Sequence, residues 1–228
     1  MIRCVQPEWL DVLSPDAPSA IASRRDLQQL NWWMNHAAIL RRALSNHGPQ
    51  PPRQIVELGA GDGTFLLRIA CQWPARNAAV HAVLVDRQNV VSADTRQAFN
   101  NLGWEVQVVQ ADALEWLEKP GPVADCLLAN LFLHHFEAEA LRHLLSVAAT
   151  RTNQFAACEP RRGPLPLAAS RILGIIGCNA VTRHDAPLSV RAGWAGRELS
   201  ALWPADGQWQ LSERRAGLFS HRFVARRK

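Results

Sequence analysis

Three glycines at alternate positions follow a short apolar run that contains an acid. The run is Ile55-Val56-Glu57-Leu58, and Gly59, Gly61 and Gly63 come directly after it. Glycine lets the chain turn sharply and lets a ligand lie against bare backbone, because it has no Cβ that would collide with that ligand. The segment 64–70 is expected to be a helix, so its first amides would face the same ligand. Strand, glycine loop and helix together predict a nucleotide-type binding site.

Three further apolar runs each carry a polar side chain at or near their ends. They are 82–86 with Asp86, 106–113 with Asp112, and 124–130 with Asn130. A carboxylate at the tip of the strand beside the glycine loop can accept hydrogen bonds from both hydroxyls of a ribose, which favours Asp86 for that role. The alternative for each acid is a solvated or capping carboxylate at the start of a loop.

This succession of motifs resembles the class I S-adenosylmethionine-dependent methyltransferase family. The segment 57–63 (Glu-Leu-Gly-Ala-Gly-Asp-Gly) matches the family's first motif, and 130–136 corresponds to its fourth motif, which faces the transferred methyl group. The resemblance is specific from about Arg53 to Phe136. It implies S-adenosyl-L-methionine as the cofactor and S-adenosyl-L-homocysteine as its product. The cofactor-binding residues that it implies are Glu57, Gly59, Ala60, Gly61, Gly63, Asp86, Arg87, Asp112, Ala113 and Asn130.

In the family's arrangement, Glu57 and the glycine loop would hold the amino-acid end of the cofactor. Asp86 would hold the ribose, and Asp112 with the Ala113 amide would hold the adenine edge. The methyl carbon of this cofactor is already a strong electrophile. The protein must therefore align it with a nucleophile, exclude water and, where needed, remove one proton.

His134 and His135 are the candidates for removing that proton. A histidine that titrates near neutral pH can accept a proton from a phenol or a carboxylic acid. Adjacent residues on a helix point about 100° apart, so at most one of the two is expected to face the site. The competing base is His184 with its neighbour Asp185, and the alternative for the histidine pair is a purely structural role.

The acceptor pocket is expected to come from segments outside the shared core. The candidate acceptor-binding residues are Arg24, Asn31, Trp32, Asn35, Arg161 and His184. A tryptophan can stack on an aromatic acceptor while an arginine holds an acidic group. We therefore expect O-methylation of a phenolic or polyketide-derived small molecule in secondary metabolism. The alternatives are methylation of RNA or protein, and a non-catalytic partner protein that binds S-adenosylmethionine.

The order of elements predicts an α/β fold with a Rossmann-like, seven-stranded, mostly parallel sheet and helices on both faces. The expected strands are 53–58, 80–86, 104–110, 123–129 and 153–158, with 209–213 and 221–225 as a C-terminal antiparallel hairpin. The expected helices are 63–73, 88–100, 137–150, 164–177 and 195–203. Residues 178–190 are expected to be irregular.

The N-terminal part is expected to form a helical cap. One helix is predicted from Ala20 to Ser45, and the proline-rich segment 48–52 would link it to the first strand. We therefore assign residues 1–52 to the cap and 53–228 to the methyltransferase domain, with an acceptor-side insertion at about 178–200. The two parts are expected to form a single structural unit.

Composition narrows the class of protein further. Of the 228 residues, 48% are hydrophobic, which argues against disorder. There is no apolar run of membrane-spanning length, and residues 1–8 lack the layout of a signal peptide, so a cytoplasmic monomer or homodimer is expected. The net charge of +5 comes from dispersed arginines, which makes nucleic acid an unfavoured partner. Five scattered cysteines without a CxxC pair predict no metal and no disulfide framework.

Overall fold

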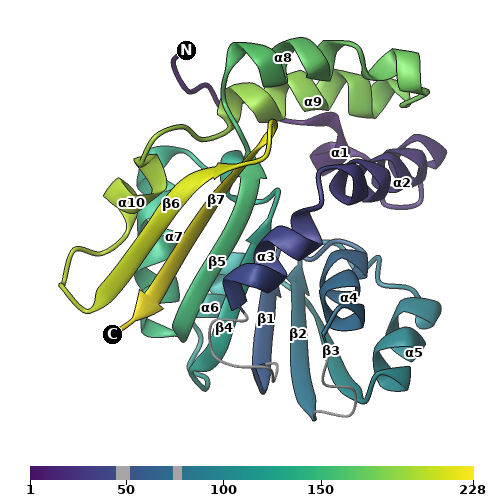
Figure 1. The fold of residues 1–228 in the computed structure, drawn as a ribbon. Helices are drawn as coiled ribbons and strands as arrows, with labels where there is room; N and C mark the ends of the chain where they lie inside the picture. The colour runs from purple at the N-terminus through teal and green to yellow at the C-terminus, as the bar shows by residue number, and fades with distance from the viewer. Residues whose placement is uncertain (45–51, 74–78) are drawn as a thin grey trace.

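A seven-stranded sheet forms the centre of the protein, in the order β3-β2-β1-β4-β5-β7-β6 (Figure 1). The computed structural model describes residues 1–44, 52–73 and 79–228. The strands are β1 (Gln54–Leu58), β2 (Val80–Asp86), β3 (Trp104–Gln110), β4 (Ala124–Asn130), β5 (Thr152–Pro160), β6 (Trp209–Ala216) and β7 (Ser220–Arg227). The first five pair in parallel, whereas β7 is antiparallel to both β5 and β6. This confirms the predicted fold class and its closing hairpin.

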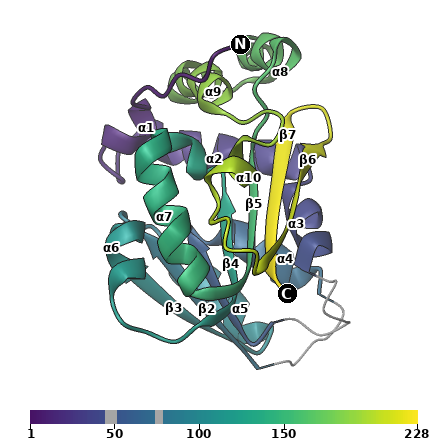
Figure 2. The same cartoon turned by 90° about the vertical axis from the view of Figure 1, so that its left-hand side faces the viewer.

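Helices cover both faces of the sheet (Figure 2). On one face lie α3 (His36–Leu44), α4 (Thr64–Cys71) and α5 (Ala93–Asn101), and on the other lie α6 (Ala113–Glu118), α7 (Ala138–Thr150) and α10 (Glu198–Leu202). The adjacent residues Leu127 and Leu128 of β4 are both fully buried, each in a different one of the two cores. Burial on both faces explains why the central strands are continuous apolar runs.

A further group of helices lies over the end of the sheet where the parallel strands finish (Figure 1). We call it the cover: α1 (Trp9–Val12), α2 (Pro18–Trp33), α8 (Pro164–Arg171), the 3-10 turn η3 (Leu173–Ile176) and α9 (Ala180–Ala192). Polar contacts join its distant segments. The Ser23 and Thr182 hydroxyls lie 2.9 Å apart, and the Trp9 and Leu10 amides donate to Asp185 at 2.9 and 3.0 Å.

The single N-terminal helix expected over residues 20–45 is wrong. Asn35 adopts a φ of +57° and ends the first helix, after which α3 starts at His36 in a new direction. Asparagine tolerates this left-handed conformation better than most residues. As a result α2 belongs to the cover, whereas α3 packs on the sheet beside α4. The predicted proline-rich link lies outside the described residues except for Pro52.

The sequence-based prediction was also wrong about two other helices. The segment 178–190, expected to be irregular, forms α9, which begins where the Asn179 side chain accepts a hydrogen bond from Thr182 N. Pro187 inside this helix concealed its periodicity, because proline normally interrupts helices. Helix α6 was not predicted, and Asp112 caps its N-terminus. Within the described residues, no helix combines the length and apolarity that a bilayer span requires.

Candidate active site

A cavity of about 760 Å³ lies between the ends of the parallel strands and the cover. The glycine loop after β1, the tip of β2 and the residues after β4 line its sheet side. Helices α2 and α9 and the turn η3 line the opposite side. The cavity therefore occupies the place where open parallel sheets bind ligands, beyond the carboxyl ends of the strands.

The glycine loop presents bare backbone to this cavity. The Gly59 and Ala60 amides donate to Val85 O at 2.9 and 3.1 Å, which ties the loop to the end of β2. Gly61 has a φ of +54°, and a Cβ built on it would meet no described atom within 4 Å. At Gly59 such a Cβ would lie only 2.3 Å from the Phe132 ring. A side chain at Gly61 would thus fill open cavity space, whereas one at Gly59 would clash.

Glu57 is a buried acid with one unsatisfied oxygen. Its side chain is 1% exposed, and Oε2 has no hydrogen-bond partner among the described residues. Burial, together with the nearby Asp62 and Asp86 carboxylates, raises the pKa of Glu57 well above its usual value. A cationic donor placed beside this carboxylate would satisfy Oε2 and relieve the repulsion.

Asp86 and Asp112, the other two predicted acids, differ in the partners of their carboxylates. Asp86 accepts hydrogen bonds from the backbone amides of Gly61 and Gln88, both at 2.8 Å. Asp112 caps α6 through Leu114 N at 2.8 Å and also pairs with Arg87 at 2.5 Å. Partial burial opposes ionisation of Asp112, but the hydrogen bonds from Arg87 and from the helix amides lower its pKa. The capping role left open for Asp112 is therefore present, while its carboxylate still borders the cavity.

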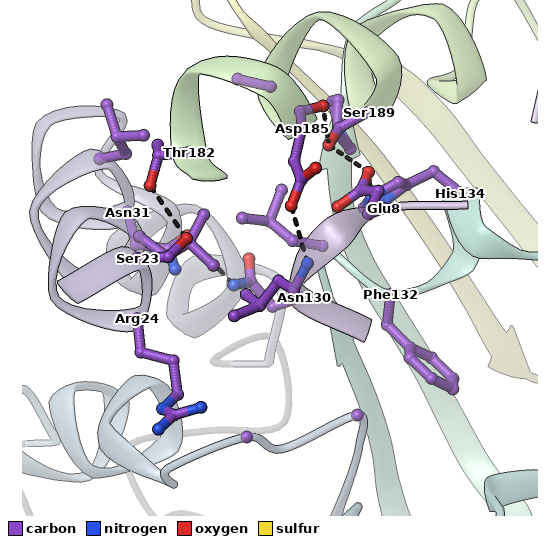
Figure 3. A pocket seen from close by; sticks show the side chains of 18 of the residues that line it. Glu8, Ser23, Arg24, Asn31, Asn130, Phe132, His134, Thr182, Asp185 and Ser189 are labelled. Carbon is purple, nitrogen blue, oxygen red and sulfur yellow. Dashed lines mark hydrogen bonds and ion pairs between the residues drawn. The ribbon is translucent and has the colours of Figure 1, made fainter. Parts of the chain in front are cut away.

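Asn130 belongs to a hydrogen-bonded chain that crosses from the sheet to the cover. His36 Nδ1 donates to Asn130 Oδ1 at 2.9 Å, and His36 Nε2 accepts from the Ser220 hydroxyl at 2.6 Å. Asn130 in turn donates to Asn31 Oδ1 on α2 at 3.1 Å (Figure 3). Burial lowers the pKa of His36 to about 4, so this histidine is neutral and acts as a fixed spacer.

His134 is a buried cation rather than a free base. Its Nδ1 lies 2.8 Å from Glu159 Oε2, and its Nε2 lies 3.5 Å from Glu8 Oε1. Burial alone would lower its pKa, but these two carboxylates raise it to about 10. A histidine already protonated at neutral pH cannot accept the proton of an acceptor. Glu159 also accepts hydrogen bonds from the Phe132 and Leu133 amides, which fixes the turn η2 (Leu133–His135).

His135 lines the cavity and pairs with the carboxylate of Asp11. Its Nδ1 lies 3.1 Å from Asp11 Oδ2, and 26% of its side chain is exposed. Partial burial raises the pKa of Asp11, but the hydrogen bond with His135 outweighs this and lowers it. Among the described residues, Glu8, His134 and His135 also bring potential metal-ligand atoms within 4.8 Å of one another. The expectation that the site needs no metal stays a prediction.

Family comparison identifies the domain that carries this cavity. Residues 55–153 match the family model described as a methyltransferase domain. This region is a class I S-adenosylmethionine-dependent methyltransferase domain. The matched region runs from β1 into β5 and so contains the glycine loop, both strand-tip acids and the histidine pair. Comparison with curated proteins gives no match.

Solved structures share the fold of this protein at low sequence identity. An O-methyltransferase family protein from Burkholderia thailandensis has a TM-score of 0.57 and 17% identity, over 86% of this chain and 57% of that one. The mitomycin 7-O-methyltransferase MmcR has a TM-score of 0.64 and 16% identity, over 96% of this chain and 60% of that one. The plantazolicin methyltransferase BpumL, solved in complex with SAH, has a TM-score of 0.65 and 12% identity. The match covers 93% of this chain and 92% of that one. This chain thus spans less than two thirds of the first two proteins.

Most of the predicted site residues of the methyltransferase lie around the cavity. Those that line it are Glu57, Gly59, Ala60, Gly61, Asp86, Arg87, Asp112, Ala113, Asn130, His134, His135, Arg24 and Asn31. Gly63 is absent from the described lining, because it packs against Leu84 of β2, where a Cβ would approach to 2.7 Å.

Four predicted acceptor residues are not among the described lining residues. Trp32 is 67% exposed on the outer side of α2, and its neighbour Trp33 lines the cavity instead. Asn35 forms the break between α2 and α3. Arg161 makes a backbone bridge with Trp194, and His184 stacks on Trp9 with ring centroids 3.7 Å apart. Their assignment as acceptor-binding residues stays a prediction.

Glu8, Asp11 and Glu159 were not among the predicted site residues. The first two precede every motif, and their partners are more than 120 residues away in the chain. Glu159 lies at the end of the apolar run of β5, just as Asp86 lies at the end of β2. This position at a strand end was the signal that could have indicated Glu159.

We expect the charge on His134 to appear in the pH dependence of stability. Its native pKa of about 10 lies above the ordinary 6.5, so the folded state keeps a proton that the unfolded chain releases between these values. The free energy of unfolding should fall as pH rises through this window, by up to about 1.4 kcal/mol per pH unit. His134→Gln should lack this contribution, as measured by urea unfolding at several pH values within the window.

His143→Gln is the matched control. His143 pairs with Glu118 at 2.8 Å on the surface, where 56% and 49% of the two side chains are exposed. This variant should keep the wild-type pH dependence. Equal loss of stability with rising pH in His134→Gln and in the wild type would contradict a charged His134.

Proposed function

We propose that this methyltransferase uses S-adenosyl-L-methionine to methylate a hydroxyl oxygen on a small phenolic or polyketide-derived acceptor. The observation that carries the proposal is the Asp11–His135 pair on the cavity wall, at 3.1 Å. A phenol must lose its proton when its oxygen is methylated, and the methyl donor cannot accept that proton. The Asp11–His135 pair supplies the proton acceptor. O-methyltransferases among the proteins of similar fold support the choice of oxygen.

The cofactor fits the residues on the sheet side of the cavity. Glu57, with its unsatisfied Oε2, would hold the α-ammonium group beside the open backbone of Gly61. Asp86 would accept from the ribose hydroxyls, since each of its oxygens has one amide donor and a free lone pair. Asp112 and the Ala113 amide would border the adenine. When bound, the cofactor supplies an electrophilic methyl group on its sulfonium.

The residues of the chain then handle the proton. With its Nδ1–H directed to Asp11, His135 keeps Nε2 as the acceptor of the hydroxyl proton. Asp11 stabilises the imidazolium that forms and fixes the ring orientation. Asn31 and Arg24, on α2, would contact the acceptor from the side of the cover.

Asp86→Ala tests the assigned cofactor site. Loss of a hydrogen bond to a charged group is worth about 1.5–3 kcal/mol, so affinity for S-adenosylmethionine should fall by a factor of about ten or more. Calorimetric titration with the cofactor, its demethylated product and NADH measures this. Asp94→Ala is the matched control, since Asp94 is exposed in the first turn of α5. Unchanged affinity in Asp86→Ala, or binding of NADH alone, would contradict the assignment.

His135→Gln tests the proton acceptor. General-base catalysis typically contributes a factor of about 10²–10⁴, so kcat should fall within this range while cofactor affinity stays constant. The loss should be smaller for a nitrophenol, which ionises without help at neutral pH. Asp11→Asn should give an intermediate loss, and His143→Gln should leave kcat unchanged. Equal losses for acidic and ordinary phenols would show that His135 positions the acceptor without taking its proton.

A further inference from the structure

Exposed isoleucines of the cover line part of the cavity. Ile172, Ile175 and Ile176 all line the cavity at or within the turn η3, and they are 58%, 83% and 49% exposed. Three large aliphatic side chains in five residues form an apolar patch of the kind that marks a binding site in soluble proteins. The fold does not use these side chains, because none of them belongs to either buried core.

The lining contributed by α8 and η3 contains no charged group. It consists of Pro166, Ala169, Ser170, Ile172, Leu173, Ile175 and Ile176. Leu27, Leu30 and Trp33 of α2 add further apolar surface to the same cavity. The charged lining residues instead come from the N-terminal segment, from α2 through Arg24, from α9 through Asp185, and from the strand ends. The cavity thus has a polar region and an apolar region.

We propose that this apolar region binds an alkyl chain carried by the acceptor. This proposal rests on the proposed function. The substrate would be an amphiphile, with its hydroxylated head beside His135 and its alkyl chain along η3. Continuity supports the occupant: η3 and His135 line the same cavity, so a single molecule can contact both. An alkyl chain also suits a lining in which the α8–η3 segment offers one side-chain hydroxyl and no charge.

The chain length of the acceptor should therefore control affinity. Burial of one methylene contributes about 0.8 kcal/mol, which corresponds to a factor of about four in the dissociation constant. Part of this is lost in ordering the chain, so two- to fourfold per methylene is expected until the chain passes Ile175. Beyond that point, added methylenes remain in water and affinity should level off.

The test is calorimetric binding of para-methyl-, para-propyl-, para-pentyl- and para-heptylphenol to the protein saturated with S-adenosylhomocysteine. The double variant Ile175→Ser/Ile176→Ser should weaken heptylphenol binding about tenfold and leave methylphenol binding unchanged. Both positions are exposed, so the variant should fold as the wild type does. Leu218→Ser is the matched control, because Leu218 is 61% exposed in the β6–β7 turn and is not a described lining residue.

Each outcome separates this proposal from the proposed function. Affinity that does not depend on chain length, or a dependence that the double variant leaves intact, would overturn the alkyl-chain site even if short phenols are methylated. Chain-dependent binding without methylation of any phenol would overturn the proposed reaction and support the chain site. Loss of binding to phosphatidylcholine vesicles in the double variant, with an unaltered phenol series, would assign the isoleucines to a lipid surface and overturn the proposal.

Discussion

The candidate site depends on a buried cation held between two carboxylates. His134 lies between Glu159, at 2.8 Å, and Glu8, at 3.5 Å, and all three side chains are almost fully buried. Removing such charges from water is costly unless pairing and hydrogen bonds compensate. Compensation here comes from backbone amides of η2 on Glu159 and from the Ser189 hydroxyl on Glu8 at 2.5 Å. The cluster therefore joins β5, η2, α9 and the N-terminal segment at one point.

The cluster of His134, Glu8 and Glu159 helps to hold the N-terminal segment in a fixed position at the cavity. Arg3 donates to Ala192 O and Phe136 O, both at 2.7 Å, while the Asp185 carboxylate accepts from the first amides of α1. With Glu8 held by His134, the next turn of chain places Asp11 beside His135. A helix as short as α1 has little stability of its own, so these contacts determine where it lies.

The parts of the site that could be predicted from the sequence are those fixed by local structure. Glycines that need a positive φ, and acids at strand tips, have the same meaning wherever the strand lies, so Gly61 and Asp86 were found from their spacing. Glu8 and Asp11 were not predicted, because their positions depend on packing against residues that are distant in the chain. Trp32 was chosen instead of Trp33 for a related reason: the helix phase of α2 depends on how α2 packs against α9.

The two adjacent histidines show how neighbouring residues of one type come to differ. His134 lies buried between two carboxylates, which keep it protonated at neutral pH. His135 sits one residue further along η2, on the cavity side, with one carboxylate at Nδ1 and a quarter of its side chain exposed. In the proposed reaction, His134 would supply the fixed charge that holds the turn, and His135 would accept the proton of the acceptor. The two rings lie side by side on the 3-10 turn, with centroids 4.2 Å apart, and both line the cavity, so the expectation that at most one would face it was wrong. Their carboxylate partners and their burial distinguish them.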